Sequence, residues 1–198
     1  MARPQHNTDL HGSVPDSCGT ALLLIDVLND FRFEGGAALA AEAMQILDAL
    51  ATLKALARAH GAPVIYVNDN AGKWRSDAGA VLRKALAPSS RGRPLVRRLK
   101  PGPRDYLILK PKQSAFYGTP LEIILDYLKV QRLVIAGLTA DICIFFTAQD
   151  AFVRDYDIVI PSDAVASQSR EAATAALREM KRLFHARISS AADIKWPR

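Results

Sequence analysis

The sequence predicts a three-layer α/β/α fold, with an open, doubly wound and mostly parallel sheet of five or six strands (Rossmann-like). Short apolar runs alternate with helical patterns along the whole chain, which is typical of a parallel sheet covered by helices on both faces. Five or six strands suit an open sheet better than an eight-stranded barrel. The chain has 198 residues, of which 49% are hydrophobic and 23% charged, and this suffices for one domain with a substantial core.

The first half of the chain contains two of the expected strands. Residues 20–25 are an apolar run that ends at Asp26, and residues 64–67 are a second run that leads into the polar loop 68–70. Between them, apolar residues recur at helical spacing over 38–60, and Gly61 and Pro63 end that pattern. Residues 78–87 predict a short helix.

The second half continues the alternation. Strands are expected at 106–109, 132–136 and 158–160, and a short edge strand can follow at 186–188. Thr119 as N-cap and Pro120 at the first helical position predict a helix that runs to about residue 129. Further helices are expected at 141–155 and 170–184.

A basic segment accounts for part of the net charge of +6. Six basic residues fall within 91–104, where three prolines interrupt them. Without aromatic interleaving or a helical pattern, this segment predicts a solvated loop and no nucleic-acid partner.

The cysteines and the amino terminus bear on location. Two cysteines, Cys18 and Cys143, do not form a disulfide framework, which favours a reducing compartment. The amino terminus lacks an apolar signal core, and the apolar stretch 37–59 carries four charged residues. We therefore expect a cytoplasmic protein without a membrane partner, with a flexible arm at 1–18 and a single domain at 19–198.

Cys143 lies where nucleophilic chemistry is favoured. A strand, a glycine, a small-residue turn and a helix follow one another around it, which places the thiol at a helix amino terminus. Unpaired N–H groups and the helix dipole favour negative charge there, and the thiolate is the reactive form of cysteine. A small buried residue is the alternative interpretation.

Two other groups are expected at the same edge of the sheet. Asp26 ends the first strand and Lys110 the third, and ligands bind at the carboxyl ends of strands in such sheets. A carboxylate can accept a thiol proton and an ammonium can stabilise the thiolate. Asp26 can instead cap a turn, and composition does not separate Lys110 from Lys112.

Three motifs carry a family resemblance. They are Asp26-x-x-Asn29-Asp30-Phe31, the segment 110–121 with Ser114-Ala115-Phe116, and Gly137-x-x-x-x-x-Cys143 followed by Thr147-Ala148-x-Asp150-Ala151. Together they resemble the isochorismatase-like cysteine hydrolases over about residues 20–190. That superfamily includes nicotinamidases, N-carbamoylsarcosine amidases, ureidoacrylate-type amidases and isochorismatases.

The resemblance implies a catalytic triad of Asp26, Lys110 and Cys143, and it selects Lys110 over Lys112. It also implies a cis peptide between Leu138 and Thr139, with the N–H groups of Thr139 and Cys143 as the oxyanion hole. The implied reaction is hydrolysis of an amide or ureido C–N bond of a small molecule through a Cys143 thioester. The alternatives are a vinyl ether hydrolase of the isochorismatase type and a catalytically silent binding or assembly module.

The sequence departs from nicotinamidases after the second strand. Relatives of that kind bind a metal through an Asp-x-His element, whereas Asp69 is followed here by Asn70 and Ala71 and residues 67–77 contain no histidine. We therefore expect neither a metal nor another cofactor. The resemblance further implies a homodimer or homotetramer. The candidate substrate-binding residues are aromatic or polar side chains near the motifs: Phe31, Asn70, Trp74, Phe116 and Tyr117.

Overall fold

Strand β1 (Thr20–Ile25) lies at the centre of the sheet in this computed structural model, which describes residues 18–72 and 77–196. The strand order is β3-β2-β1-β4-β5-β7, and β6 pairs with β4. Every pairing between these strands is parallel. The further strands are β2 (Val64–Asp69), β3 (Tyr106–Lys110), β4 (Arg132–Leu138), β5 (Asp157–Pro161), β6 (Val165–Ala166) and β7 (Arg187–Ser189).

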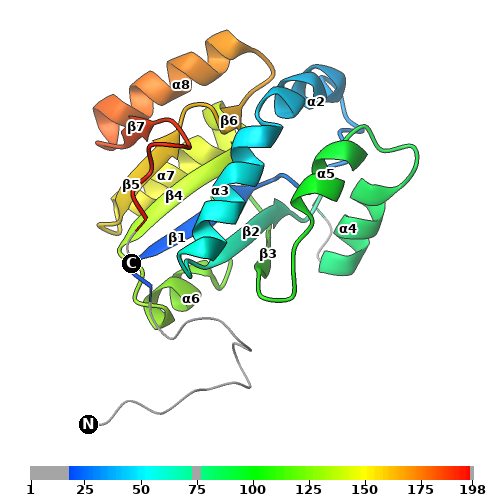
Figure 1. The fold of residues 1–198 in the computed structure, drawn as a ribbon. Coiled ribbons are helices and arrows are strands. Elements are labelled where there is room, and N and C mark those ends of the chain that lie inside the picture. Colours follow the sequence, from blue (N-terminus) through cyan, green and yellow to red (C-terminus); the bar gives the residue numbers. More distant parts are fainter. Residues whose placement is uncertain (1–17, 73–76, 197–198) are drawn as a thin grey trace.

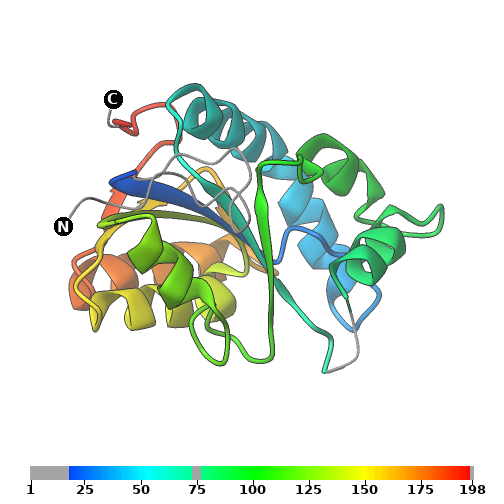
Figure 2. The ribbon, with the colours of Figure 1, turned by 90° about the horizontal axis from the view of Figure 1, so that it is seen from below.

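Helices cover both faces of the sheet (Figures 1 and 2). One layer contains α2 (Gly36–Gln45), α3 (Leu47–Ala59), α4 (Ala78–Leu86) and α5 (Arg93–Leu99). The opposite layer contains α6 (Leu121–Tyr127), α7 (Phe145–Phe152) and α8 (Arg170–Leu183). The three-layer α/β/α architecture predicted from the sequence is thus confirmed.

The side-chain alternation of β1 divides the interior into two cores. Leu22 and Leu24 pack in the core that contains α3 and α5, whereas Leu23 and Ile25 pack in the core that contains α6, α7 and α8. All four side chains are fully buried. An uninterrupted apolar run is therefore what a central strand covered on both faces requires.

Several element boundaries differ from the prediction. The sheet has seven strands, whereas five or six were expected. The strand that the prediction missed is β6, whose two residues are too few to give a periodic signal. The helix expected at 38–60 is two helices that meet at Ile46. Pro120, not Thr119, is the N-cap residue of α6, although the Thr119 hydroxyl accepts a hydrogen bond from the N–H of Leu121.

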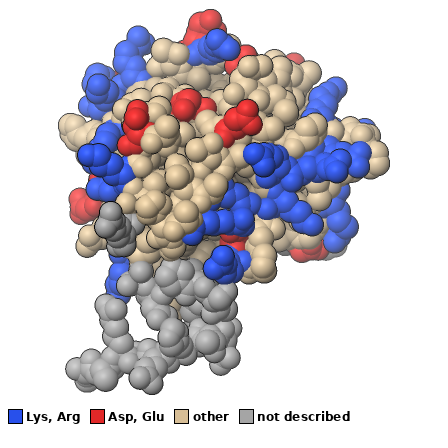
Figure 3. Space-filling view, viewed as in Figure 1, with Lys and Arg blue, Asp and Glu red and all other residues tan. Residues whose placement is uncertain are grey.

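The basic segment at 91–104 is not a simple loop, and that prediction was wrong. It contains α5, in which Pro94 lies in the first turn. Backbone N–H groups of a first turn have no acceptor within the helix, so a proline at this position costs no intrahelical hydrogen bond. Leu95 and Leu99 are fully buried in the first core. The exposed face of α5 carries Arg97 and Arg98, and Figure 3 shows Lys and Arg side chains gathered over this part of the surface.

Within residues 18–72 and 77–196, no single helix is long and apolar enough to cross a membrane. Helices α2 and α3, bent by 56° at their junction, meet that criterion only as a pair. The arm expected at 1–18 lies outside the described residues except for Cys18, whose N–H donates to the carbonyl of Leu128 at 2.8 Å.

Candidate active site

The carboxyl ends of four neighbouring strands form the candidate site. Asp26 follows β1, Asp69 ends β2 and Lys110 ends β3, while Cys143 lies in the turn after β4. The ammonium of Lys110 lies 2.9 Å from Oδ2 of Asp26 and 3.4 Å from Sγ of Cys143. Because β2 separates β3 from β1, the long lysine side chain spans the end of β2 to reach both groups.

The ammonium of Lys110 is fully buried and has further acceptors. It donates to the carbonyl of Lys112 at 3.2 Å and lies 3.9 Å from the Asp69 carboxylate. The N–H of Asp69 in turn donates to the other oxygen of Asp26 at 2.7 Å. The structure therefore brings Asp26, Lys110 and Cys143 together, whereas the side chain of Lys112 is exposed.

The backbone before Cys143 follows an unusual path. Gly137 has φ +116°, and a Cβ at this position would lie 2.2 Å from the carbonyl oxygen of Ile25, so only glycine fits between β1 and β4. The next peptide bond, between Leu138 and Thr139, is cis. A π-helical turn over Ala140–Ile144 then carries Cys143 into α7.

A hydroxyl fixes this turn against the neighbouring loop. Thr147 is fully buried and donates to the carbonyl of Cys143 at 2.6 Å. The same hydroxyl accepts from the N–H of Ala115 at 3.0 Å. Nearby, Ser114 donates to the carboxylate of Asp150. The motif residues Ser114, Thr147 and Asp150 thus join the Cys143 helix to the segment that follows Lys110.

Burial and charge set the ionisation of the cluster. Burial raises the pKa of Asp26, although the Lys110 ammonium opposes this. Burial and the nearby Asp26 carboxylate raise the pKa of the Cys143 thiol to about 12. Burial by itself would lower the pKa of Lys110, but Asp26, Cys143 and Asp69 together outweigh burial, and the pKa lies above its ordinary value. At neutral pH, the cluster therefore holds an ammonium and a neutral thiol.

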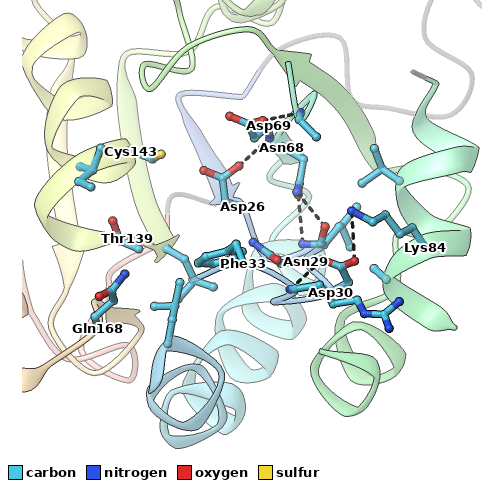
Figure 4. A pocket seen from close by; sticks show the side chains of 18 residues that line it. Asp26, Asn29, Asp30, Phe33, Asn68, Asp69, Lys84, Thr139, Cys143 and Gln168 are labelled. Carbon is cyan, nitrogen blue, oxygen red and sulfur yellow. Dashed lines mark hydrogen bonds and ion pairs between the residues drawn. The ribbon is translucent and has the colours of Figure 1, made fainter. Parts of the chain in front are cut away.

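A cavity of about 480 Å³ opens beside these groups, a size typical of small-molecule sites. Asp26, Thr139 and Cys143 lie at one end of the cavity in Figure 4, and Asp30 and Lys84 lie at the other, with Asn29 between. Phe33, Leu39 and Ile142 contribute apolar surface.

The residues that line the cavity differ from the expected substrate contacts. Phe31 and Phe116 are buried in the two cores, and Tyr117 is exposed to 62%. Asn70 is buried and accepts from the N–H of Gly72. None of these four is among the described residues that line the cavity. Trp74 lies outside the described residues.

Other polar, charged or aromatic side chains line the cavity. They are Asn29, Asp30, Arg32, Phe33, Asp69, Lys84 and Gln168. Asp69 ends a parallel strand, so the rule that selected Asp26 and Lys110 could have found it. Asn29 and Phe33 follow Asp26 closely, but the sequence does not say which loop side chains face the cavity. Nothing in the local sequence marks Gln168.

The end of β2 does not fit the metal site of nicotinamidases. Ala71 stands where the histidine of Asp-x-His would be, and its N–H donates to the Asp69 carboxylate. The other carboxylate oxygen of Asp69 faces the Lys110 ammonium. Within the described part of the chain, no three His, Cys, Asp or Glu side chains lie close enough together to hold a metal ion.

Comparison with known proteins finds chains that are similar in sequence and in structure over most of their length. The chain is 37% identical to the isochorismatase family protein YaaI of Bacillus subtilis over 174 residues, which are 88% of this chain and 95% of YaaI. N-carbamoylsarcosine amidase from Thermoplasma acidophilum is 27% identical with a TM-score of 0.68, covering 89% of this chain and 98% of the amidase. Nicotinamidase PncA from Bacillus subtilis is 31% identical with a TM-score of 0.68, covering 87% of this chain and 99% of PncA.

The family model of the isochorismatase domain matches residues 20–193. This range contains the whole sheet and all the groups at the carboxyl ends of its strands. The chain therefore belongs to the isochorismatase family.

Proposed function

We propose that this chain is a cysteine hydrolase that cleaves the C–N bond of a small amide or ureido compound through a thioester on Cys143. The observation that carries the proposal is the buried Lys110 ammonium in contact with both Asp26 and Cys143. Carboxylate, ammonium and thiol meet at the end of a cavity large enough for a small molecule. These groups supply a nucleophile, a base and a stabilising charge, which suit covalent acyl transfer.

The resting charges define the first step. The thiol is protonated, because a thiolate beside the Asp26 carboxylate would place two buried anions next to one ammonium. Transfer of the thiol proton to Asp26 leaves a single anion, now on sulfur, still facing Lys110. Asp26 thus acts as the general base while the sulfur attacks the carbonyl carbon. Lys110 stabilises the single negative charge of the pair, which lies on Asp26 before the proton transfer and on the sulfur of Cys143 after it.

The remaining steps return the proton. The S–C bond forms and the carbonyl oxygen becomes an oxyanion. When the C–N bond breaks, Asp26 gives its proton to the departing nitrogen, which leaves as ammonia or an amine. Asp26 then takes a proton from water as the water attacks the thioester, and the thiol regains that proton when the acid departs.

The oxyanion is expected to bind to the N–H groups of Thr139 and Cys143. Other amides of this turn already have acceptors: Asp141 donates to the hydroxyl of Ser167, and Ile142 and Ile144 donate to the carbonyl of Thr139. Backbone donors fixed in this way need no reorganisation during the reaction.

The relatives support the same bond type. N-carbamoylsarcosine amidase and nicotinamidase are named for C–N hydrolysis. The missing histidine at the end of β2 separates this chain from the metal-binding form of the site. A ureido compound or a simple amide fits this reading better than nicotinamide does.

A screen of small amides and ureido compounds tests the proposal by release of ammonia. We expect turnover by the wild-type protein, none by the Cys143→Ala or Asp26→Asn variants, and strongly reduced turnover by Lys110→Met. Cys18→Ala and Lys112→Met are matched controls, because each removes a side chain of the same type that is not part of the cluster.

Two outcomes would contradict the proposal. One is ammonia release that Cys143→Ala leaves unchanged. The other is hydrolysis of isochorismate that does not need Cys143, which would favour the vinyl ether reaction instead.

A further inference from the structure

We infer that the substrate carries a carboxylate, which Lys84 and Arg32 bind at the end of the cavity opposite Cys143. This inference rests on the proposed amide or ureido hydrolysis and specifies its substrate class. Both cations line the same cavity as Asp26 and Cys143. Lys84 comes from α4 and Arg32 from the loop after β1. The Lys84 ammonium and the backbone N–H of Arg32 both contact the carboxylate of Asp30, so two separate parts of the chain supply positive charge beside it.

A buried carboxylate holds Lys84 at the cavity. The Lys84 ammonium lies 3.1 Å from Oδ2 of Asp30, whose side chain is only 8% exposed, whereas that of Lys84 is 65% exposed. The other oxygen of Asp30 accepts from the N–H of Arg32 at 3.2 Å. Oδ2 of Asp30 has no hydrogen-bond partner among the described residues, so its contact with Lys84 is an ion pair without hydrogen-bond geometry. The N–H donors of the ammonium therefore remain available to a ligand.

Arg32 adds a charge that is not neutralised. Among the described residues, its exposed guanidinium forms neither an ion pair nor a hydrogen bond. Asp30 balances Lys84, so the positive charge of Arg32 remains in excess at this end of the cavity. A planar guanidinium binds a carboxylate with two parallel hydrogen bonds.

The opposite end of the cavity has the opposite excess. Two carboxylates, Asp26 and Asp69, share the single ammonium of Lys110. The cavity is therefore polarised, with net negative charge beside Cys143 and net positive charge beside Lys84. This field would orient an acid amide with its carboxylate away from Asp26 and its amide toward the sulfur.

The space between the two ends suits an uncharged linker. Phe33 offers apolar surface there, and Asn29 lies between Asp26 and the Asp30–Lys84 pair (Figure 4). A short chain with an amide at one end and a carboxylate at the other matches this sequence of environments. A neutral amide of equal length would leave Arg32 without a partner.

Matched pairs of probes test the inference. Each pair consists of an ω-carboxyl amide and the diamide of the same length, such as succinamate with succinamide and glutaramate with glutaramide. We expect the wild-type kcat/KM to favour the acid amide about ten-fold or more at the best chain length, and salt to weaken this preference.

Variants assign that preference to residues. Lys84→Met and Arg32→Gln should each lower the ratio of acid amide to diamide about ten-fold. Lys84→Arg keeps the charge and should retain most of the ratio. Arg83→Gln removes an exposed neighbour on α4 that is not among the described cavity residues, and it should leave the ratio unchanged. Thermal unfolding of each variant reports whether its fold is intact.

Binding measured without turnover separates this inference from the proposed function. The Cys143→Ala protein should bind succinamate or glutaramate more tightly than the diamides, and Lys84→Met should abolish that difference. Selective binding without turnover in the wild type would support the anion site and overturn the proposed function. Turnover of both members of a pair at equal kcat/KM, or failure of every acid amide to bind selectively, would overturn the inference.

Discussion

Replacement of Lys110 by methionine is the sharpest perturbation of the proposed chemistry. Methionine keeps much of the apolar volume of the buried side chain and removes the ammonium that faces Asp26 and Cys143. The neighbouring Lys112→Met variant is the matched control, because its side chain is exposed and only its carbonyl contacts the cluster.

The magnitude follows from the two distances. With an effective dielectric constant of about 20, a charge pair at 2.9 Å is worth about 6 kcal/mol and one at 3.4 Å about 5 kcal/mol. Lys110 therefore stabilises the anion on Asp26 and the anion on sulfur almost equally. Without it, burial favours neutral Asp26 and neutral Cys143, and the site has no base. If a third of that interaction, about 2 kcal/mol, survives the desolvation of the ammonium, the ionised fraction falls about thirty-fold.

The assay is kcat/KM at neutral pH with whichever amide the wild type turns over. We expect at least about a thirty-fold loss for Lys110→Met and wild-type activity for Lys112→Met. Circular dichroism and thermal unfolding establish that both variants are folded. A folded Lys110→Met protein with kcat/KM within three-fold of the wild type would refute the reasoning.

Three further predictions follow from the site. Ultraviolet difference spectra between the wild type and Cys143→Ala should show no thiolate at neutral pH, because the pKa of Cys143 is raised to about 12. A thiolate that titrates below 9.0, the ordinary pKa of a cysteine thiol, would contradict this prediction. The kcat/KM of the wild type should fall on acidification with a midpoint above 3.8, because the ionised carboxylate is the active form and burial raises the pKa of Asp26; a midpoint at or below 3.8 would argue against Asp26 as the base. Gly137→Ala should lower the free energy of unfolding by about 2 kcal/mol or more, because its Cβ would lie 2.2 Å from the Ile25 carbonyl oxygen at a φ of +116°. Gly19→Ala is the control, because a Cβ there would meet open space. Equal denaturation midpoints for the two variants would contradict this prediction.

The sheet was predictable because its strands are buried on both faces. Uninterrupted apolar runs such as 21–25 and 133–136 give a strong signal, and the alternation with helices indicates the parallel arrangement. The same logic missed β6, whose two residues carry no period. It also missed α5, since the prolines around its seven residues obscured a pattern in which only one face is apolar.

The reacting groups were easier to place from sequence than the substrate contacts. Asp26 and Lys110 end strands and Cys143 follows one, so topology alone brings them to one edge. Loop side chains obey no such rule. Phe31 is buried in the core while Phe33, two residues later, lines the cavity.

Tertiary packing decides which of these loop residues is turned inward. A Cβ at Gly92 would lie 2.9 Å from the Phe31 ring, so the N-cap of α5 packs directly on that ring. At the cavity, the ammonium of Lys84 pairs with the buried carboxylate of Asp30, which is far away in the sequence. Neither contact has a signature in the local sequence.

The measurement that tests the central claim most directly is mass spectrometry of the protein quenched in acid during turnover. Intact mass followed by peptide mapping should find an adduct with the mass of the substrate acyl group on Cys143, and none on Cys18. The adduct should be absent from Cys143→Ala and should decay as the acid product accumulates. Turnover of an amide with no acyl adduct on Cys143, or with the same rate in Cys143→Ala, would contradict the proposed mechanism.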